Sequence, residues 1–245
     1  MLRASLVVVA LLSPTAVAAE MDPHHQHHDG HSMPMEAAPG QDSPPAEGKP
    51  AHGHGAHAGH GPHDVGPAGE TYDLRFIDAM VQHHTGALRM SEFVFDIGKP
   101  GIGSLAKSIW KEQAQEIKAM LQWRKRWYPR APVYPVSQRP GASADDLSGL
   151  QRMSAQDIEA MRMTGQPPSR QTRQVWFLEG MLHHHGGALL MAHDALDKSS
   201  NPTIRRFSRG VILAQRQEII QLRRWLGTLG LRKPEYHQFD PYFSI

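Results

Sequence analysis

The sequence contains one helical pattern twice, and this repeat is the strongest constraint on what the chain can fold into. Residues 76–90 read FIDAMVQHHTGALRM, and residues 177–191 read FLEGMLHHHGGALLM. A looser pair follows, IWKEQAQEIKAMLQW at residues 109–123 and VILAQRQEIIQLRRW at residues 211–225. Because each unit holds two helix-length segments, the repeat predicts two helical hairpins built on one plan.

Apolar side chains recur at alternating steps of three and four in four segments, which predicts four bundle helices. The expected helices run from near Thr71 to Ile97, from about Ser104 to Trp127, from about Thr172 to Asp197, and from Pro202 to Leu229. Asn201 is a suitable N-cap for the last helix, and Pro202 fits its first position. The predicted fold class is therefore all-α: a four-helix bundle made of two repeated helical hairpins.

Composition and the positions of Gly- and Pro-rich stretches divide the chain into parts. We expect a signal peptide over residues 1–19, a disordered segment over residues 20–70, the bundle over residues 71–229 and a C-terminal tail over residues 230–245. The halves of the bundle cover residues 71–128 and 171–229, with a connector over residues 129–170. The connector carries one expected short helix, Ser154 to Met163, with Ser154 as N-cap and Asp157 as capping acid. The tail aromatics, Tyr236, Phe239, Tyr242 and Phe243, are expected to cover the bundle.

The N-terminus has the three parts of a secretory signal: a positive charge at Arg3, a short apolar core, and the small residues Ala16-Val17-Ala18. An apolar run this short does not span a bilayer, and no later stretch is apolar enough to do so. We expect an exported product without a membrane span, which is periplasmic if the source is a Gram-negative bacterium.

The charge balance argues against a nucleic-acid partner. The chain has 26 basic and 24 acidic side chains, and the basic ones are scattered rather than clustered in a stripe. It has no cysteine, so disulfides and thiolate metal sites are excluded.

Residues 20–70 are rich in Pro, Gly, Ala and His and lack apolar periodicity, so we expect them to be disordered. Their histidines are His24, His25, His27, His28, His31, His52, His54, His57, His60 and His63. Tracts of this kind are typical of metal binding, and imidazole suits copper, zinc and nickel. A soluble spacer or an expression tag is the alternative, and the irregular spacing behind a signal peptide argues against a tag.

Polar residues lie among the recurring apolar positions of the expected helices, which form a stripe along each helix. Their presence has to be explained, because a carboxylate between apolar helix faces costs several kcal/mol unless it is paired or binds a metal. Glu116 and Glu218 are equivalent in the repeat, as are His83 and His184, so each half offers one carboxylate and one imidazole to the interior. Methionines would surround them: Met80, Met90, Met120, Met181 and Met191. Thioether sulfur favours Cu(I) or Ag(I).

Four further residues lie off the central stripe. His84 and His185 lie about 100° round each helix from it, one turn beyond Met80 or Met181, so a His and Met pair is available on that flank. Asp78 and Glu179 lie well off the stripe, and we expect them to be solvated charges that suit the helix dipole.

A purely structural reading is the alternative for each residue taken singly. Methionine often fills irregular gaps in a core, and His83 with Glu116 could form a satisfied buried pair. The doubling of the His-His pattern and of Gln-x-x-Glu favours a metal site, since ionisable groups are seldom fully buried.

The segments DLRFIDAMVQHHTGALRM with EQAQEIKAMLQW, and VWFLEGMLHHHGGALLM with AQRQEIIQLRRW, resemble the family known as domain of unknown function 305. The resemblance spans about residues 72–226, including MSAQDIEAM in the connector. It implies a ferritin-like fold and, through its CopM-like copper-tolerance members, an exported protein that binds copper or silver ions and lowers their toxicity. The metal-associated positions that it implies are Met80, His83, His84, Met90, Glu116, Met120, Met181, His184, His185, Met191 and Glu218.

The second copy departs from the family pattern at two positions. The early aspartate is present as Asp73 but is replaced by Gln174, and the methionine after the second Gln-Glu motif is Leu222. We therefore expect the second half to bind metal less tightly or in a different way.

The function expected from these features is sequestration of copper ions, Cu(I) or Cu(II), or of silver, with zinc less favoured. Other exported copper-handling proteins are candidate partners, and the oligomeric state is not indicated. An enzyme is the second hypothesis, but a di-iron or di-manganese bundle needs Glu-x-x-His on two helices, and none of the four expected helices has it. The third hypothesis is a structural exported bundle with a metal-buffering tail.

Overall fold

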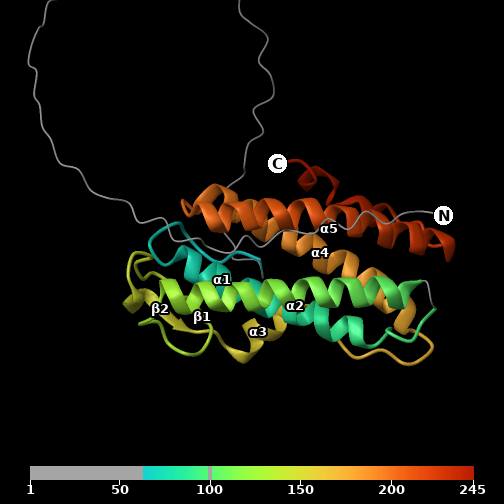
Figure 1. Cartoon of the computed structure of the whole chain (residues 1–245), viewed down its shortest axis with the longest axis horizontal. Helices are drawn as coiled ribbons and strands as arrows, with labels where there is room; N and C mark the ends of the chain where they lie inside the picture. Colours follow the sequence, from blue (N-terminus) through green and yellow to red (C-terminus); the bar gives the residue numbers. More distant parts are fainter. Residues whose placement is uncertain (1–62, 99–100) are drawn as a thin grey trace, which may run out of the picture. The chain divides into compact units, whose positions relative to one another are not determined.

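The computed structural model describes residues 63–98 and 101–245 of the chain, and its main elements are two helical hairpins. The helices are α1 (Tyr72–Glu92), α2 (Ile102–Trp127), α4 (Arg173–Lys198) and α5 (Pro202–Thr228). α1 packs against α2 and α4 against α5, and the two hairpins meet through α1 and α4 (Figure 1). The prediction of an all-α bundle of two repeated hairpins is confirmed.

The expected signal peptide and nearly all of the expected disordered segment lie outside the described residues, including every histidine of that segment except His63. Residues 63–70, which were expected to belong to it, have a defined path against α1. Within the described ranges, no helix is long and apolar enough to cross a membrane.

The first helix ends earlier than its periodicity predicts. α1 ends at Glu92, whereas the stripe continues through Val94 to Ile97. The chain turns here instead: the N–H of Val94 bonds to the carbonyl of Ser91, and that of Ile97 to the carbonyl of Val94. Val94 is still fully buried, so the apolar pattern marks burial beyond the end of the helix.

The connector contains the expected short helix, α3 (Ala155–Arg162), and its capping box is confirmed. The Ser154 hydroxyl accepts from the N–H of Asp157 at 3.0 Å, and the Asp157 carboxylate accepts from the N–H of Ser154 at 3.3 Å. The sequence did not predict a two-stranded antiparallel sheet, β1 (Val136–Gln138) with β2 (Leu150–Arg152), in which Ser137 lies opposite Gln151. A short 3₁₀ turn, η1 (Leu147–Gly149), precedes β2.

Asp78 is buried, so the expectation that it is a solvated charge is wrong. Its carboxylate accepts two hydrogen bonds from Arg124, at 2.6 and 3.0 Å, and one from the N–H of Val136 at 2.8 Å. Burial raises the pKa of Asp78, and the bonds from Arg124 oppose that shift. The residue faces outward from the α1–α4 seam, but β1 and α3 cover that side of α1.

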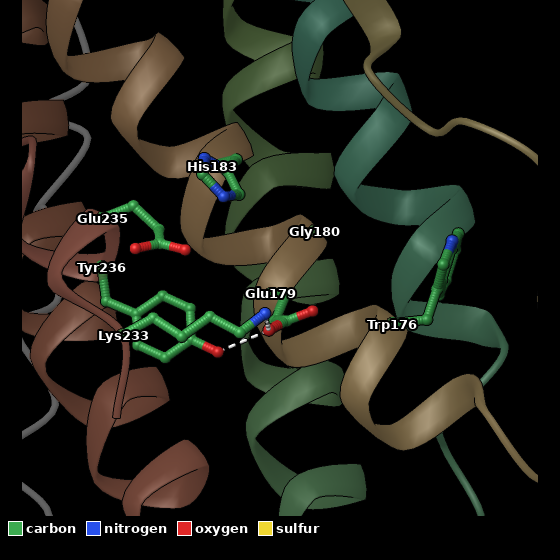
Figure 2. Close-up of a pocket in the computed structure, with 7 residues that line it drawn as sticks. All are labelled: Trp176, Glu179, Gly180, His183, Lys233, Glu235 and Tyr236. Carbon is green, nitrogen blue, oxygen red and sulfur yellow. Dashed lines mark hydrogen bonds and ion pairs between the residues drawn. The ribbon is translucent and has the colours of Figure 1, made fainter. Parts of the chain in front are cut away.

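The C-terminal tail packs over the bundle as two 3₁₀ turns, η2 (Pro234–His237) and η3 (Asp240–Tyr242). Tyr236 is buried, and Phe239 and Phe243 pack against the core. Glu179 is likewise not a free solvated charge, because it accepts from the hydroxyl of Tyr236 and lies 2.8 Å from Nζ of Lys233 (Figure 2). The tail is therefore tied to α4 by ionic as well as apolar contacts.

Candidate metal centre

His83 of α1 and His184 of α4 face each other where the two hairpins meet. Both side chains are completely buried, and their ring centroids are 3.7 Å apart. Nε2 of His184 lies 2.8 Å from the backbone carbonyl oxygen of His83. The two residues are equivalent in the repeat, so the hairpins meet at matching positions, as the sequence predicts.

The hydrogen bond of His184 determines which of its ring nitrogens can bind a ligand. A carbonyl oxygen only accepts, so Nε2 must carry the proton. Burial holds the pKa of His184 well below its ordinary value, and the nearby His185 lowers it further, so the ring is neutral. Nδ1 is then a bare lone pair, and it has no hydrogen-bond partner among the described residues.

His83 is in a similar state. Burial lowers the pKa of His83 well below its ordinary value, and the neighbouring His184 adds to the effect. Both ring nitrogens are buried, and neither finds a hydrogen-bond partner within residues 63–98 and 101–245. One of them must be an unprotonated lone pair in the neutral ring.

The second histidine of each motif pairs with a glutamate of the adjacent helix. Nε2 of His84 lies 2.8 Å from Oε2 of Glu116, and Nε2 of His185 lies 2.7 Å from Oε2 of Glu218. In the second pair the carboxylate oxygen lies off the direction of a hydrogen bond. Both imidazoles are fully buried, whereas the carboxylates keep side-chain exposures of 23% and 15%.

This pairing corrects two expectations. The sequence placed Glu116 in the seam with His83, and it placed His84 on a flank beside that seam. In the structure α2 packs on the flank of α1 that carries His84, so the flank is interior and Glu116 meets His84 there. The same holds for Glu218 of α5 and His185 of α4.

The pair of His84 and Glu116 is arranged as metal-binding histidines usually are. A carboxylate that accepts the proton of one ring nitrogen fixes the ring and leaves the other nitrogen free to bind a metal. Nδ1 of His84 and Nδ1 of His185 are buried and without a hydrogen-bond partner in the part of the chain that the structure describes. Four histidines thus offer unpaired nitrogens to the interior: His83, His84, His184 and His185.

The predicted methionine donors are all buried and fall into two groups. One core cluster contains Met80, Met120 and Met191, and the other contains Met90 and Met181. Met80 lies one helical turn from His84, and Met181 one turn from His185, so each sulfur shares a helix face with an imidazole. Leu222 is the repeat equivalent of Met120, and it lies in the cluster that contains Met90 and Met181.

Glu112 is a residue that sequence reasoning missed. Burial raises the pKa of Glu112, and the charge of Glu218 on α5 raises it further. Its carboxylate accepts from the Ser108 hydroxyl at 3.2 Å. Glu112 on α2 and Glu218 on α5 therefore bring two acidic groups into electrostatic interaction. The repeat offers no signal for this residue, because its counterpart is Ala214.

Among the described residues, no three His, Asp or Glu side chains converge closely enough to hold a metal ion by themselves. The structure brings the predicted donors together as pairs: His83 with His184, His84 with Glu116, and His185 with Glu218. Any ion held here would need a methionine sulfur, a further imidazole, or a rotation of the rings.

His183, the extra histidine of the second copy, lies apart from these pairs. It lines a surface cavity of about 270 Å³, shown in Figure 2, and its Nδ1 is 3.1 Å from the side-chain nitrogen of Gln238. The other lining residues are Trp176, Glu179, Gly180, Lys233, Glu235 and Tyr236.

The sequence model of the family described as Domain of unknown function (DUF305) matches residues 73–226, well over half of the chain. The chain belongs to the DUF305 family. The matched range contains both copies of the His-His motif, Glu116 and Glu218, and all five predicted methionine donors.

Solved DUF305 proteins and CopM have related structures. CopM in its Cu(I)-bound form is 25% identical and covers 64% of this chain and 96% of its own, with a TM-score of 0.47. A DUF305 fragment from Deinococcus radiodurans is 25% identical, covering 66% of this chain and 99% of its own at a TM-score of 0.47. A DUF305 protein from Streptomyces coelicolor is 25% identical and covers 65% of this chain and 93% of its own, with a TM-score of 0.49. No curated relative matches the chain.

Proposed function

We propose that this protein is an exported metal-binding protein that sequesters copper or silver ions and contributes to metal tolerance. The observation that carries the proposal is the set of buried imidazole nitrogens without hydrogen-bond partners among the described residues. Leaving a buried polar atom unsatisfied costs about 1–3 kcal/mol, so several such atoms in one interior need a reason. A metal ion bound during function supplies one.

The proposed ligands are the unpaired ring nitrogens of His83, His84, His184 and His185, together with sulfurs of the two methionine groups. Met80, Met120 and Met191 would serve the first half, and Met90 and Met181 the second. In this proposal Glu116 and Glu218 orient His84 and His185 rather than bind the ion directly, because each carboxylate already faces Nε2 of its histidine.

The chemistry of this donor set favours monovalent ions. Thioether sulfur is a soft ligand that selects Cu(I) over harder ions, and imidazole also accepts copper. A neutral imidazole and a thioether bring no charge into the interior, so a singly charged ion is easier to bury there than a doubly charged one.

The His-rich segment before the bundle is proposed to collect ions, Cu(II) in particular, outside the described residues. Its imidazoles are suited to fast, weak binding, and tethering them to the bundle raises the local metal concentration. The leader at residues 1–19 is proposed to export the protein to the compartment where these ions are met.

Competition titrations test the proposed metal preference. We expect the purified mature protein to bind Cu(I) or Ag(I) more tightly than Zn(II), and Met→Leu changes at Met80, Met120, Met181 and Met191 to weaken Cu(I) binding most. Leucine has nearly the volume of methionine, so the fold should be retained. Equal or preferred binding of Zn(II) by the unchanged protein would sink the proposal.

A further inference from the structure

Residues 63–70 form a strap that is held firmly across α1. The Arg75 side chain, only 1% exposed, donates hydrogen bonds to the carbonyls of Val65 and Pro67 and to the Thr71 hydroxyl. Lys198, at the end of α4, donates to the carbonyl of Gly66 at 3.0 Å. Cations from α1 and α4 therefore fix the strap.

The strap delivers the His63 ring to a place on α4 that lacks a side chain. A Cβ atom on Gly187 would lie 2.5 Å from Cε1 of His63 and 3.0 Å from each of its ring nitrogens. Real Cβ contacts are not that short, so the ring occupies space that only a glycine leaves open. At Gly86, the repeat equivalent on α1, the carbonyl of Arg162 takes the corresponding space.

At this position His63 lies beside the central histidine pair. Its ring centroid is 5.9 Å from that of His83, and the rings meet edge to face at 72°. Nδ1 of His63 is buried and has no hydrogen-bond partner in the described ranges, as is true of both nitrogens of His83 and of Nδ1 of His184. Unpaired imidazole nitrogens from three separate segments thus lie near one another, but among the described residues no three side chains are close enough to hold a metal ion as they stand.

We propose that His63 supplies a third imidazole to the His83–His184 pair and completes a three-histidine site for one Cu(I) or Ag(I) ion. The inference rests on the proposed function and names the residue through which the His-rich segment joins the bundle site. Each ring binds through the lone pair of its unprotonated nitrogen, so no proton is released. The rings must turn to bring the three nitrogens together, and no hydrogen bond to a described residue holds the His83 ring.

The test uses the full mature protein with His63→Gln, which keeps the approximate size of the side chain. Ag(I) is titrated against a competing chelator, and ¹⁵N spectra of histidine-labelled protein report which ring nitrogens bind. We expect the variant to lose at least about tenfold in affinity at the tightest site, as for other perturbed metal centres. In the unchanged protein, the ring signals of three histidines, His63, His83 and His184, should shift together.

Two further variants sharpen the test. Gly187→Ala keeps the His63 imidazole but fills its place, so it should lose affinity as His63→Gln does, with helicity retained. His237→Gln, a matched change at an exposed histidine of the tail, should bind as the unchanged protein does. If His63→Gln binds as tightly as His237→Gln while His83→Gln with His184→Gln loses the site, this inference is overturned and the proposed function stands. If the variant His83→Gln with His184→Gln also binds normally, the proposal of a metal site in the bundle is itself wrong.

Discussion

Burying an imidazole nitrogen without a hydrogen bond destabilises a fold by about 1–3 kcal/mol. His83 and His184 both carry such nitrogens, and their ring centroids are 3.7 Å apart. A bundle held only by packing would be more stable with apolar side chains here. The interior therefore keeps unpaired nitrogens at a cost in stability, and the proposed metal site would give them a role. Methionine at the neighbouring positions adds polarizable sulfur without adding charge.

The lowered pKa values of His83 and His184 predict that the metal-free protein loses stability in acid. The unfolded chain takes up protons on these residues near pH 6.5, whereas the folded state excludes them. Stability therefore rises with pH wherever the unfolded state binds more protons. Below pH 6.5 the free energy of unfolding should fall by up to about 1.4 kcal/mol per pH unit for each residue.

Urea denaturation between pH 5 and pH 8 measures this effect. In the variant His83→Gln with His184→Gln, the free energy of unfolding should change clearly less with pH below pH 6.5. If the free energy of unfolding depends on pH equally in the variant and in the unchanged protein, the acid sensitivity comes from other groups.

The carboxylates that face His84 and His185 should tune metal affinity without binding the ion. Glu116→Gln with Glu218→Gln keeps an oxygen that can accept from Nε2 but removes the negative charge that strengthens the ring as a ligand. Cu(I) affinity should fall by about 10- to 100-fold, with the number of bound ions unchanged, as measured by chelator competition. Loss of a whole ion per molecule would instead make these glutamates direct ligands.

At the scale of the elements, Asp78 joins three parts of the fold: α1, which carries it, α2 through Arg124, and β1 through the N–H of Val136. Breaking a buried ion pair by removing one partner costs about 3–5 kcal/mol. Asp78→Ala should therefore lower the free energy of unfolding by about that amount, because Arg124 loses its only carboxylate partner among the described residues and the Val136 N–H loses its acceptor. Chemical denaturation at pH 7 measures the change.

Asp96 provides the control for this pair. Its carboxylate also accepts two bonds from an arginine, Arg173, but its side chain is 65% exposed. Solvent screens such a pair, so Asp96→Ala should change stability little. Equal losses at the two positions would contradict the structural role given to Asp78.

Local signals in the sequence were enough to predict the helices, except for the end of α1 at Glu92. Asn201 and Pro202 define the start of α5, and the Ser154–Asp157 capping box defines that of α3, because caps act over three residues. The strands β1 and β2 have three residues each and are held partly by Asp78, 58 residues away from Val136. Periodicity contains no such long-range information.

The sequence named the residues that form the pairs of the candidate site, but it did not predict how they pair. The repeat identified His83 and His184 because equivalent positions on α1 and α4 meet. The partner of Glu116 depends on which flank of α1 receives α2, and the sequence does not specify this. His63 was placed in a low-complexity segment because the space that receives its ring is left by Gly187, which is distant in the chain.

At the scale of the whole molecule, the two similar halves differ at positions of the repeat. Leu222 stands where the first half has Met120, and Gln174 stands where it has Asp73. Asp73 accepts a hydrogen bond from Ser199 at 2.6 Å, which fixes the end of α4 against α1. We therefore expect two classes of Cu(I) site, with the tighter class in the half that carries Met80, Met120 and His84.

The central claim is that the bundle itself holds monovalent copper, whatever the preceding segment collects. Three proteins are compared by Cu(I) and Cu(II) titration: the mature protein, residues 63–245 alone, and the mature protein with His83, His84, His184 and His185 all changed to Ala. Residues 63–245 should keep the tightest Cu(I) sites and lose most of the Cu(II) capacity, while the fourfold variant should do the opposite. If residues 63–245 are folded by circular dichroism and bind no Cu(I), the doubled motif is structural and the claim is wrong.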